Sequence, residues 1–123
     1  MSQVISSLSR SVIPAPMAGG PTTPELVHAA YAAGSFGTLG LGSASIDSAR
    51  TQIEQCAGIP FGVNLFCPQD PLTEPYLAAA RELAQAENQS LPEPDYAFGY
   101  EEKLELALRG GARVVWSMFG TFN

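Results

Sequence analysis

Residues 12–20 of this 123-residue chain read Val-Ile-Pro-Ala-Pro-Met-Ala-Gly-Gly, an apolar run that ends in two glycines. The run predicts a buried strand whose last residues are backbone with almost no side-chain cover. Pro14 and Pro16 have no backbone N–H, so few donors remain to pair this strand with a neighbour. Many α/β enzymes use a strand, a glycine turn and a helix to bring backbone N–H groups close to a flat or anionic ligand. The stretch therefore predicts a ligand site at the first strand–helix junction, although Gly19 and Gly20 would also suit a plain tight turn.

Outward from this stretch, short apolar runs alternate with helical patterns. Strands are expected at residues 12–17, 36–42, 60–66 and 113–120, and helices at residues 23–33, 45–57, 73–88 and 100–109. This alternation is typical of a parallel sheet with right-handed crossover helices, so the expected fold class is α/β with about four parallel strands. Residues 67–98 are long for a plain connection and are expected to form an excursion over the end of the sheet.

The first expected helix has two competing start signals. Thr22 with Glu25 would form a capping box, whereas Thr23 followed by Pro24 would form an N-cap with proline in the first turn. Sequence alone leaves both starts open.

Composition excludes several classes of partner. Hydrophobic residues make up 46% of the chain and charged residues only 15%, with a formal net charge of −6. Lys103 is the only lysine, and the arginines are scattered, so nucleic acid and anionic membranes are not expected partners. Leu104, Ala107, Leu108 and Gly111 are expected to form the inner face of the last helix.

The two cysteines predict no metal site. Cys56 and Cys67 lie far apart, without a CxxC motif or a nearby histidine pair. They are expected to be reduced, buried thiols of a cytoplasmic protein. Residues 1–10 lack the apolar core of a secretory signal, and no apolar stretch approaches the roughly 20 residues of a membrane span.

Two residues stand out as candidate ligand contacts. Met17 ends the first apolar run, where it would offer a soft apolar surface, although methionine also fills irregular gaps in cores. Asn64 lies in an otherwise apolar strand, and a buried amide needs hydrogen-bond partners. Trp116 and Ser117, on the last strand, are expected to be packing residues and pocket wall.

Four motifs in this order resemble those of the nitronate monooxygenase family, once called 2-nitropropane dioxygenases. They are Ala-Pro-Met-Ala-Gly-Gly at residues 15–20 with Thr-Pro-Glu-Leu at 23–26, Ala-Gly-Ser-Phe-Gly-Thr-Leu-Gly at 33–40, Pro-Phe-Gly-Val-Asn-Leu-Phe at 60–66, and Val-Val-Trp-Ser-Met-Phe-Gly at 114–120. The four matches extend across nearly the whole chain, and their order makes the resemblance specific.

The resemblance implies a (β/α)₈ barrel that binds FMN and oxidises alkyl nitronates with O₂. It implies that the backbone at Ala15, Pro16 and Met17 lies against the isoalloxazine ring. Asn64 would hydrogen-bond the flavin or its ribityl side. Barrel enzymes place their chemistry at the carboxyl ends of the strands, which is where these residues are expected.

The resemblance covers only part of such a barrel. A complete barrel has eight strands and about 250 residues, so residues 1–123 are expected to form the N-terminal half, with 67–98 as an excursion within it. The phosphate site of such barrels usually follows strands seven and eight, and the family's catalytic histidine would lie beyond residue 123. His28, the only histidine here, is expected on an outer helix and does not inherit that role.

Two other interpretations stay open. Flavin-type enoyl-acyl carrier protein reductases are related, but tend to have Gly-Gly-Met where this chain has Ala15, Pro16 and Met17. Alternatively, the chain is an inactive half-barrel, whose open strand edges predict self-association as a homo-oligomer.

Overall fold

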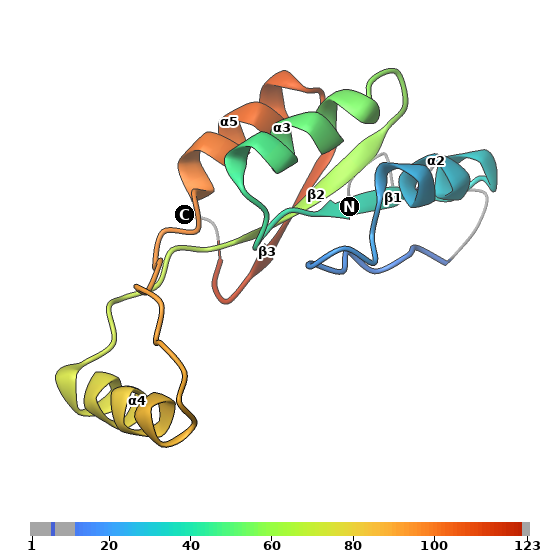
Figure 1. The fold of residues 1–123 in the computed structure, drawn as a ribbon. Coiled ribbons are helices and arrows are strands. Elements are labelled where there is room, and N and C mark those ends of the chain that lie inside the picture. The colour runs from blue at the N-terminus through green and yellow to red at the C-terminus, as the bar shows by residue number, and fades with distance from the viewer. Residues whose placement is uncertain (1–5, 7–11, 122–123) are drawn as a thin grey trace.

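The computed structural model describes residue 6 and residues 12–121 (Figure 1). Its elements, in chain order, are α2 (Pro24–Ala32), β1 (Gly37–Gly40), α3 (Ile46–Gln55), β2 (Phe61–Phe66), α4 (Glu74–Ala86), α5 (Tyr100–Arg109) and β3 (Val114–Met118). The strands form one three-stranded parallel sheet in the order β1-β2-β3. Each strand is joined to the next through a crossover that contains helix, so the expected α/β class with a parallel sheet is confirmed.

The register of the sheet separates a core face from a second face. Leu39 lies opposite Val63, and Val63 lies opposite Val115. These side chains join the core that α3 and α5 cover on one side of the sheet (Figure 1). Because neighbouring residues of a strand point to opposite faces, Gly40 and Asn64 face the other side.

The structure decides how the first helix starts. Thr23 is the N-cap of α2: its side chain accepts a hydrogen bond from the backbone N–H of Leu26 at 3.3 Å, and Pro24 takes the first helical position. The alternative capping box of Thr22 does not form, because the Thr22 hydroxyl is bonded to the segment that precedes it. In the same way, Ser45 caps α3 by accepting from the N–H of Ser48 at 3.2 Å.

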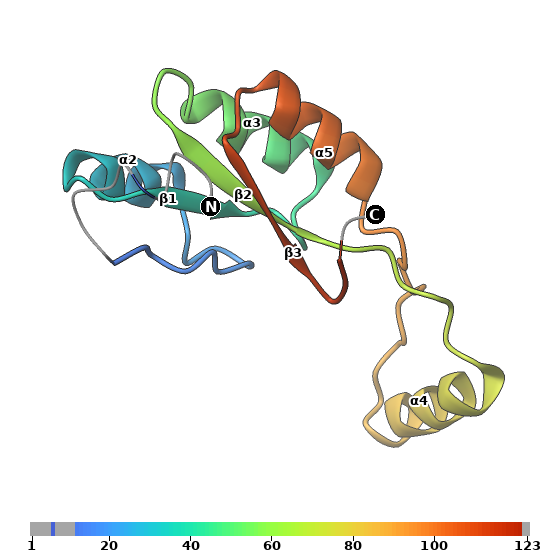
Figure 2. The ribbon, with the colours of Figure 1, turned by 180° about the vertical axis from the view of Figure 1, so that it is seen from behind.

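The strand expected at residues 12–17 is not formed. This segment is irregular and lies beside β1 on the side away from α3 and α5, as the two opposite views show (Figures 1 and 2). Pro14 and Pro16 explain the difference. Both would present their nitrogen toward the same neighbour, and neither can donate to a ladder. The described part of the sheet therefore has three strands and not the expected four.

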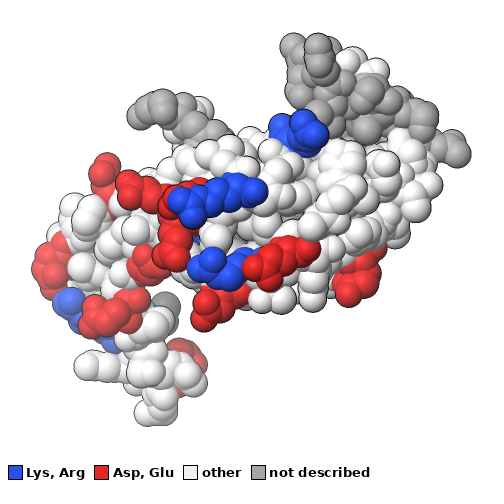
Figure 3. All heavy atoms as spheres, turned by 90° about the horizontal axis from the view of Figure 1, so that it is seen from above, with Lys and Arg blue, Asp and Glu red and all other residues white. Residues whose placement is uncertain are grey.

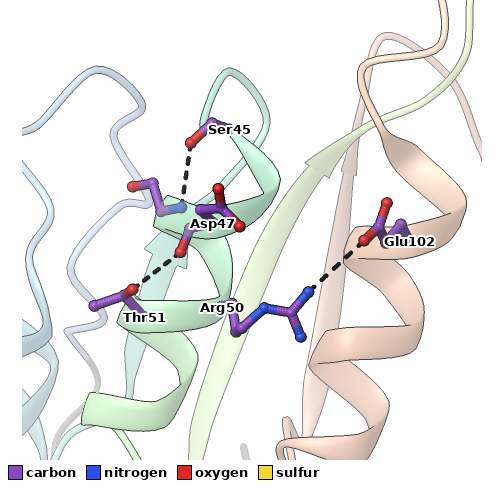
Figure 4. A network of polar contacts seen from close by, with 6 residues as sticks. Ser45, Asp47, Arg50, Thr51 and Glu102 are labelled. Carbon is purple, nitrogen blue, oxygen red and sulfur yellow. Dashed lines mark hydrogen bonds and ion pairs between the residues drawn. The ribbon is translucent and has the colours of Figure 1, made fainter.

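Helix α5 packs through part of the expected face, at Leu104 and Ala107, but the expectation was wrong for Leu108 and Gly111. Lys103 and Ala107 are its buried residues, whereas Leu108 is 62% exposed. Leu104 is partly buried against the core. On the outer side, α3 and α5 are linked by an ion pair between Arg50 Nη2 and Glu102 Oε1 at 3.8 Å (Figure 4).

Helix α4 stands apart from the sheet at the end of two extended arms (Figures 1 and 2). It has no buried residue, and Tyr76 and Leu83 are exposed. The arms meet at their base, where the backbone N–H of Gln69 donates to the carbonyl oxygen of Tyr96 at 2.8 Å. Residues 67–98 thus leave and rejoin the fold at the carboxyl ends of β2 and β3.

Candidate functional site

The Thr22 hydroxyl organises the first ligand-binding candidate, the backbone at residues 15–17. It accepts the backbone N–H of Met17 at 2.8 Å and donates to the carbonyl oxygen of Ala15 at 3.3 Å. Thr22 itself is buried. Gly19 and Gly20 have φ values of 82° and 119°, which turn the chain back toward Thr22 in a conformation that other residues rarely adopt. One buried hydroxyl therefore fixes an otherwise irregular segment.

Gly40 brings this segment onto the end of β1. A Cβ atom built on Gly40 would lie 2.7 Å from both the carbonyl carbon and the carbonyl oxygen of Met17. Only a residue without a side chain allows the two backbones to come so close. Gly40 is also the residue of β1 that lies opposite Asn64 in β2. Through Gly40, the structure brings Met17 and Asn64 to the same place.

Asn64 is a buried amide with a long hydrogen bond to β3. It is 3% exposed, and its Nδ2 donates to the carbonyl oxygen of Trp116 at 3.4 Å. The backbone oxygen of Asn64 accepts from the N–H of Leu41 at 3.0 Å, which continues the pairing of the two strands past the end of β1.

The face of the sheet that carries Gly40 and Asn64 also has a polar contact, which the sequence did not indicate. Trp116 Nε1 donates to Thr38 Oγ1 at 3.2 Å, across the whole three-stranded sheet. Thr38 is buried and lies two residues before Gly40, so both belong to the same face. Trp116 was expected only as packing and wall, and Thr22 only as a helix cap. The strand alternation shared by Thr38 and Gly40 was the available signal for Thr38.

The candidate ligand contacts at residues 15–17 differ in how exposed their side chains are. The Met17 side chain is 42% exposed, so it is not a core filler, and Ala15 is also exposed, while Pro16 is half-buried. The backbone of these residues and the Asn64 amide border a face that α3 and α5 leave uncovered. This arrangement offers an apolar surface with a few fixed polar groups, which suits a planar ligand with one polar edge.

Three aromatic rings pack together at the carboxyl ends of β2 and β3. The Phe66 ring packs edge-on against Phe98 and Phe119, with centroids 5.5 and 4.9 Å apart. Gln69 Nε2 donates to the carbonyl oxygen of Phe119 at 2.9 Å. The backbone N–H of Cys67 donates to the carbonyl oxygen of Met118 at 3.0 Å. These contacts tie the excursion to the strand ends.

The remaining titratable candidates lie outside this site. His28 Nε2 contacts the carbonyl oxygen of Gln55 at 2.8 Å, which links α2 to the end of α3. Burial, and to a smaller extent the charge of Glu25, raises the pKa of the Cys56 thiol to about 11. Cys56 and Cys67 are both free and buried. Among the described residues, no group of His, Cys, Asp or Glu side chains could hold a metal ion, and no helix there has the length and apolar character to cross a bilayer.

The parallel sheet and its crossover helices define part of a barrel-type α/β fold. A family model described as nitronate monooxygenase matches residues 3–122. This chain belongs to the nitronate monooxygenase family. The solved nitroalkane oxidase from Streptomyces ansochromogenes is 32% identical and has a TM-score of 0.77, over 95% of this chain and 36% of that one.

Two curated proteins are similar over about half of the chain. A nitronate monooxygenase from Paraburkholderia phytofirmans is 40% identical over 63 residues, which are 49% of this chain and 17% of that protein. A protein from Staphylococcus saprophyticus named "Probable nitronate monooxygenase" is 43% identical over 67 residues, which are 52% of this chain and 19% of that protein. The chain therefore spans only a minor part of the length of its relatives.

Proposed function

We propose that this chain is the N-terminal part of an FMN-dependent oxidoreductase that oxidises alkyl nitronates with O₂. Family membership and the name of the solved relative support an oxidoreductase that acts on small nitro compounds. The observation that carries the proposal is the meeting of Met17, Gly40 and Asn64 at the strand ends. Barrel enzymes build their active sites at this end of the sheet.

In this proposal, the backbone at Ala15, Pro16 and Met17 lies against the isoalloxazine ring, and the Asn64 amide bonds the flavin edge or its ribityl chain. Three features of the residues fit such a ring. The missing Cβ of Gly40 lets the Met17 backbone reach the end of β1, the exposed Met17 side chain offers a soft apolar surface, and the buried Asn64 amide lies opposite Gly40. When bound, FMN supplies the electron acceptor that the oxidation of a nitronate by O₂ requires.

The chain's own residues would hold and orient the ring. The Thr22 hydroxyl fixes the backbone at residues 15–17, and the Trp116–Thr38 hydrogen bond supports the strand face beneath it. We expect the phosphate site and the histidine that transfers a proton to lie in the part of the barrel that this chain does not include. The 123-residue chain alone is therefore expected to bind FMN weakly and to have no turnover.

The test compares the chain with the protein made from its complete gene. The complete protein should purify with bound yellow flavin and consume O₂ with propyl-2-nitronate. Titration of the 123-residue chain with FMN, followed by flavin fluorescence, should show weak binding. A colourless complete protein without O₂ uptake would contradict the proposal. NADH oxidation driven by an enoyl thioester, in place of nitronate oxidation, would support the enoyl reductase interpretation.

A second proposal concerns the chain by itself: it self-associates through its open sheet. Among the described strands, β3 pairs only with β2, so its other edge is open. Met118 is 46% and Phe119 62% exposed beside that edge. Open apolar edges favour pairing with another copy. Analytical ultracentrifugation should show dimers or larger species, and a monomer at all concentrations would contradict this proposal.

A further inference from the structure

Lys103 is a buried ammonium without a counter-ion among the described residues. It is the only lysine of the chain and is 3% exposed, and its Nζ donates to the carbonyl oxygen of Gly42 at 3.0 Å. No described carboxylate forms an ion pair with it. Lysine is almost never fully buried unless its charge is paired. A buried charge with a single backbone acceptor therefore requires a physical explanation.

Close helix packing places Lys103 in this position. Gly99, which precedes α5, has a φ of 60°, and a Cβ built on it would lie 2.8 Å from Ile46 Cδ1. Because Gly99 has no side chain, the start of α5 can approach the start of α3. The Lys103 side chain then reaches past Gly99 to the turn between β1 and α3.

The Lys103 side chain lines a cavity of about 600 Å³ between the starts of α3 and α5 and the excursion of residues 67–98, and this cavity is open to solvent on the side of Leu72 and Leu91. The volume is within the range of about 300–1,000 Å³ that is usual for small-molecule sites. Its apolar walls come mainly from Ile46, Leu72, Leu77, Leu91 and Phe98. The cavity therefore combines hydrocarbon walls with one buried positive charge.

Two carboxylates also line the cavity, and both lie toward solvent. Asp95 is exposed, and its Oδ1 accepts the backbone N–H groups of Ala97 and Phe98 at 3.0 Å each. Glu93 is exposed as well. Burial lowers the pKa of Lys103, while the charge of Asp95 raises it to a smaller extent. Asp95 therefore compensates the ammonium only partly.

We propose that this cavity binds an amphipathic monoanion, an aliphatic carboxylate that pairs with Lys103 and lays its hydrocarbon chain against Leu72, Leu77 and Leu91. The carboxylate would supply the missing counter-charge, and charge-assisted hydrogen bonds of this kind are stronger than neutral ones. The start of α3 beside Gly42 adds the positive end of a helix dipole. The chain has 12 Asp and Glu against 6 Lys and Arg, and blue groups in Figure 3 lie beside red ones, which disfavours a large polyanion. This proposal does not depend on flavin binding.

The test is calorimetric titration of the 123-residue chain with octanoate, octan-1-ol and octylamine, which share a tail and differ in charge. Octanoate should bind about tenfold or more tightly than octan-1-ol, and octylamine should bind most weakly. Equal affinity for octanoate and octan-1-ol, or no heat with octanoate, would overturn the proposal.

Two pairs of variants locate the binding. Lys103→Met keeps the side-chain stem but removes the charge, and should weaken octanoate binding by about 10- to 100-fold. Arg50→Met removes a positive charge from α3 outside the cavity and should leave binding unchanged. Ala80 lines the cavity and its neighbour Ala79 does not, so Ala80→Phe should block binding and Ala79→Phe should not.

Circular dichroism shows whether Lys103→Met folds. If it does not fold, the comparison of Ala80→Phe with Ala79→Phe decides whether octanoate binds in the cavity. Equal octanoate affinity of Ala80→Phe and Ala79→Phe would place the ligand elsewhere and overturn the proposal. Unchanged octanoate binding in folded Lys103→Met would likewise overturn it.

Discussion

Gly40 and Met17 touch through their backbones, at a distance that no other residue type at position 40 would allow. The site of a Cβ on Gly40 is 2.7 Å from the carbonyl oxygen of Met17. This contact holds an irregular, proline-containing segment against the end of β1, directly beside Asn64. It thereby brings residues of the first and third motifs to a common surface.

We expect Gly40→Ala to displace residues 15–18 and to destabilise the fold by about 1–3 kcal/mol, as overpacking does. FMN affinity of the complete protein should fall with it. Urea denaturation and flavin titration measure the two effects. Gly19→Ala is the comparison, because a Cβ there meets nothing within 4 Å and adds only backbone strain at φ 82°. A Gly40→Ala protein with unchanged stability and flavin affinity would show that the contact is unimportant.

Thr22→Val should cost about 1–3 kcal/mol, because it leaves the backbone N–H of Met17 without its acceptor in a partly buried place. It should also weaken flavin binding, since the backbone at residues 15–17 loses its anchor. Thr23→Val removes only the helix cap and should cost about 1 kcal/mol with little effect on flavin. Both variants are compared by urea denaturation and flavin titration. Equal flavin affinities for the two variants would contradict the anchoring role of Thr22.

Asn64→Leu tests the amide at nearly constant volume. Stability should change little, because an apolar group of similar shape replaces an amide with one long hydrogen bond of 3.4 Å. Flavin affinity of the complete protein should fall about tenfold, as the loss of one ligand hydrogen bond predicts. Flavin titration and urea denaturation separate the two effects. Loss of stability without loss of flavin affinity would indicate that Asn64 has only a structural role.

Stability should fall as the pH rises from about 9 to about 11 through the ionisation of Cys56. The thiol pKa is raised from 9.0 to about 11 in the folded chain, so the unfolded chain loses this proton first. The folded state binds more protons in that interval, and its stability therefore decreases with pH. Urea denaturation at several pH values, compared with Cys56→Ala, isolates this contribution. Identical pH profiles for the two proteins would contradict it.

Both thiols should be unreactive toward a thiol reagent in the native chain at pH 8, because both are buried. Unfolding in urea should expose them together. Rapid labelling of Cys56 before Cys67 in the native state would show that the core around α3 opens locally.

The sequence alone determined the α/β class and three of the four strand assignments with their flanking helices. Residues 60–66 and 113–120 are apolar and rich in β-branched and aromatic residues, so local pattern and burial favour the same structure. The start at Thr23 and Pro24 was one of two options that local chemistry permitted. Contacts distant in sequence decided between them, because the Thr22 hydroxyl is taken by Met17 and Ala15.

Only the tertiary structure decided that Lys103, and not Leu108, joins Leu104 and Ala107 on the inner face of α5, and what happens to residues 12–17. Helical periodicity predicted Leu108 inside, but α5 is rotated so that Lys103 lies inside and Leu108 outside. The hydrogen bond to Gly42 and the space left by Gly99 make that rotation tolerable, and neither is visible along the chain. Sequence patterns record what each residue prefers locally, whereas the candidate site depends on distances between segments that only packing brings together.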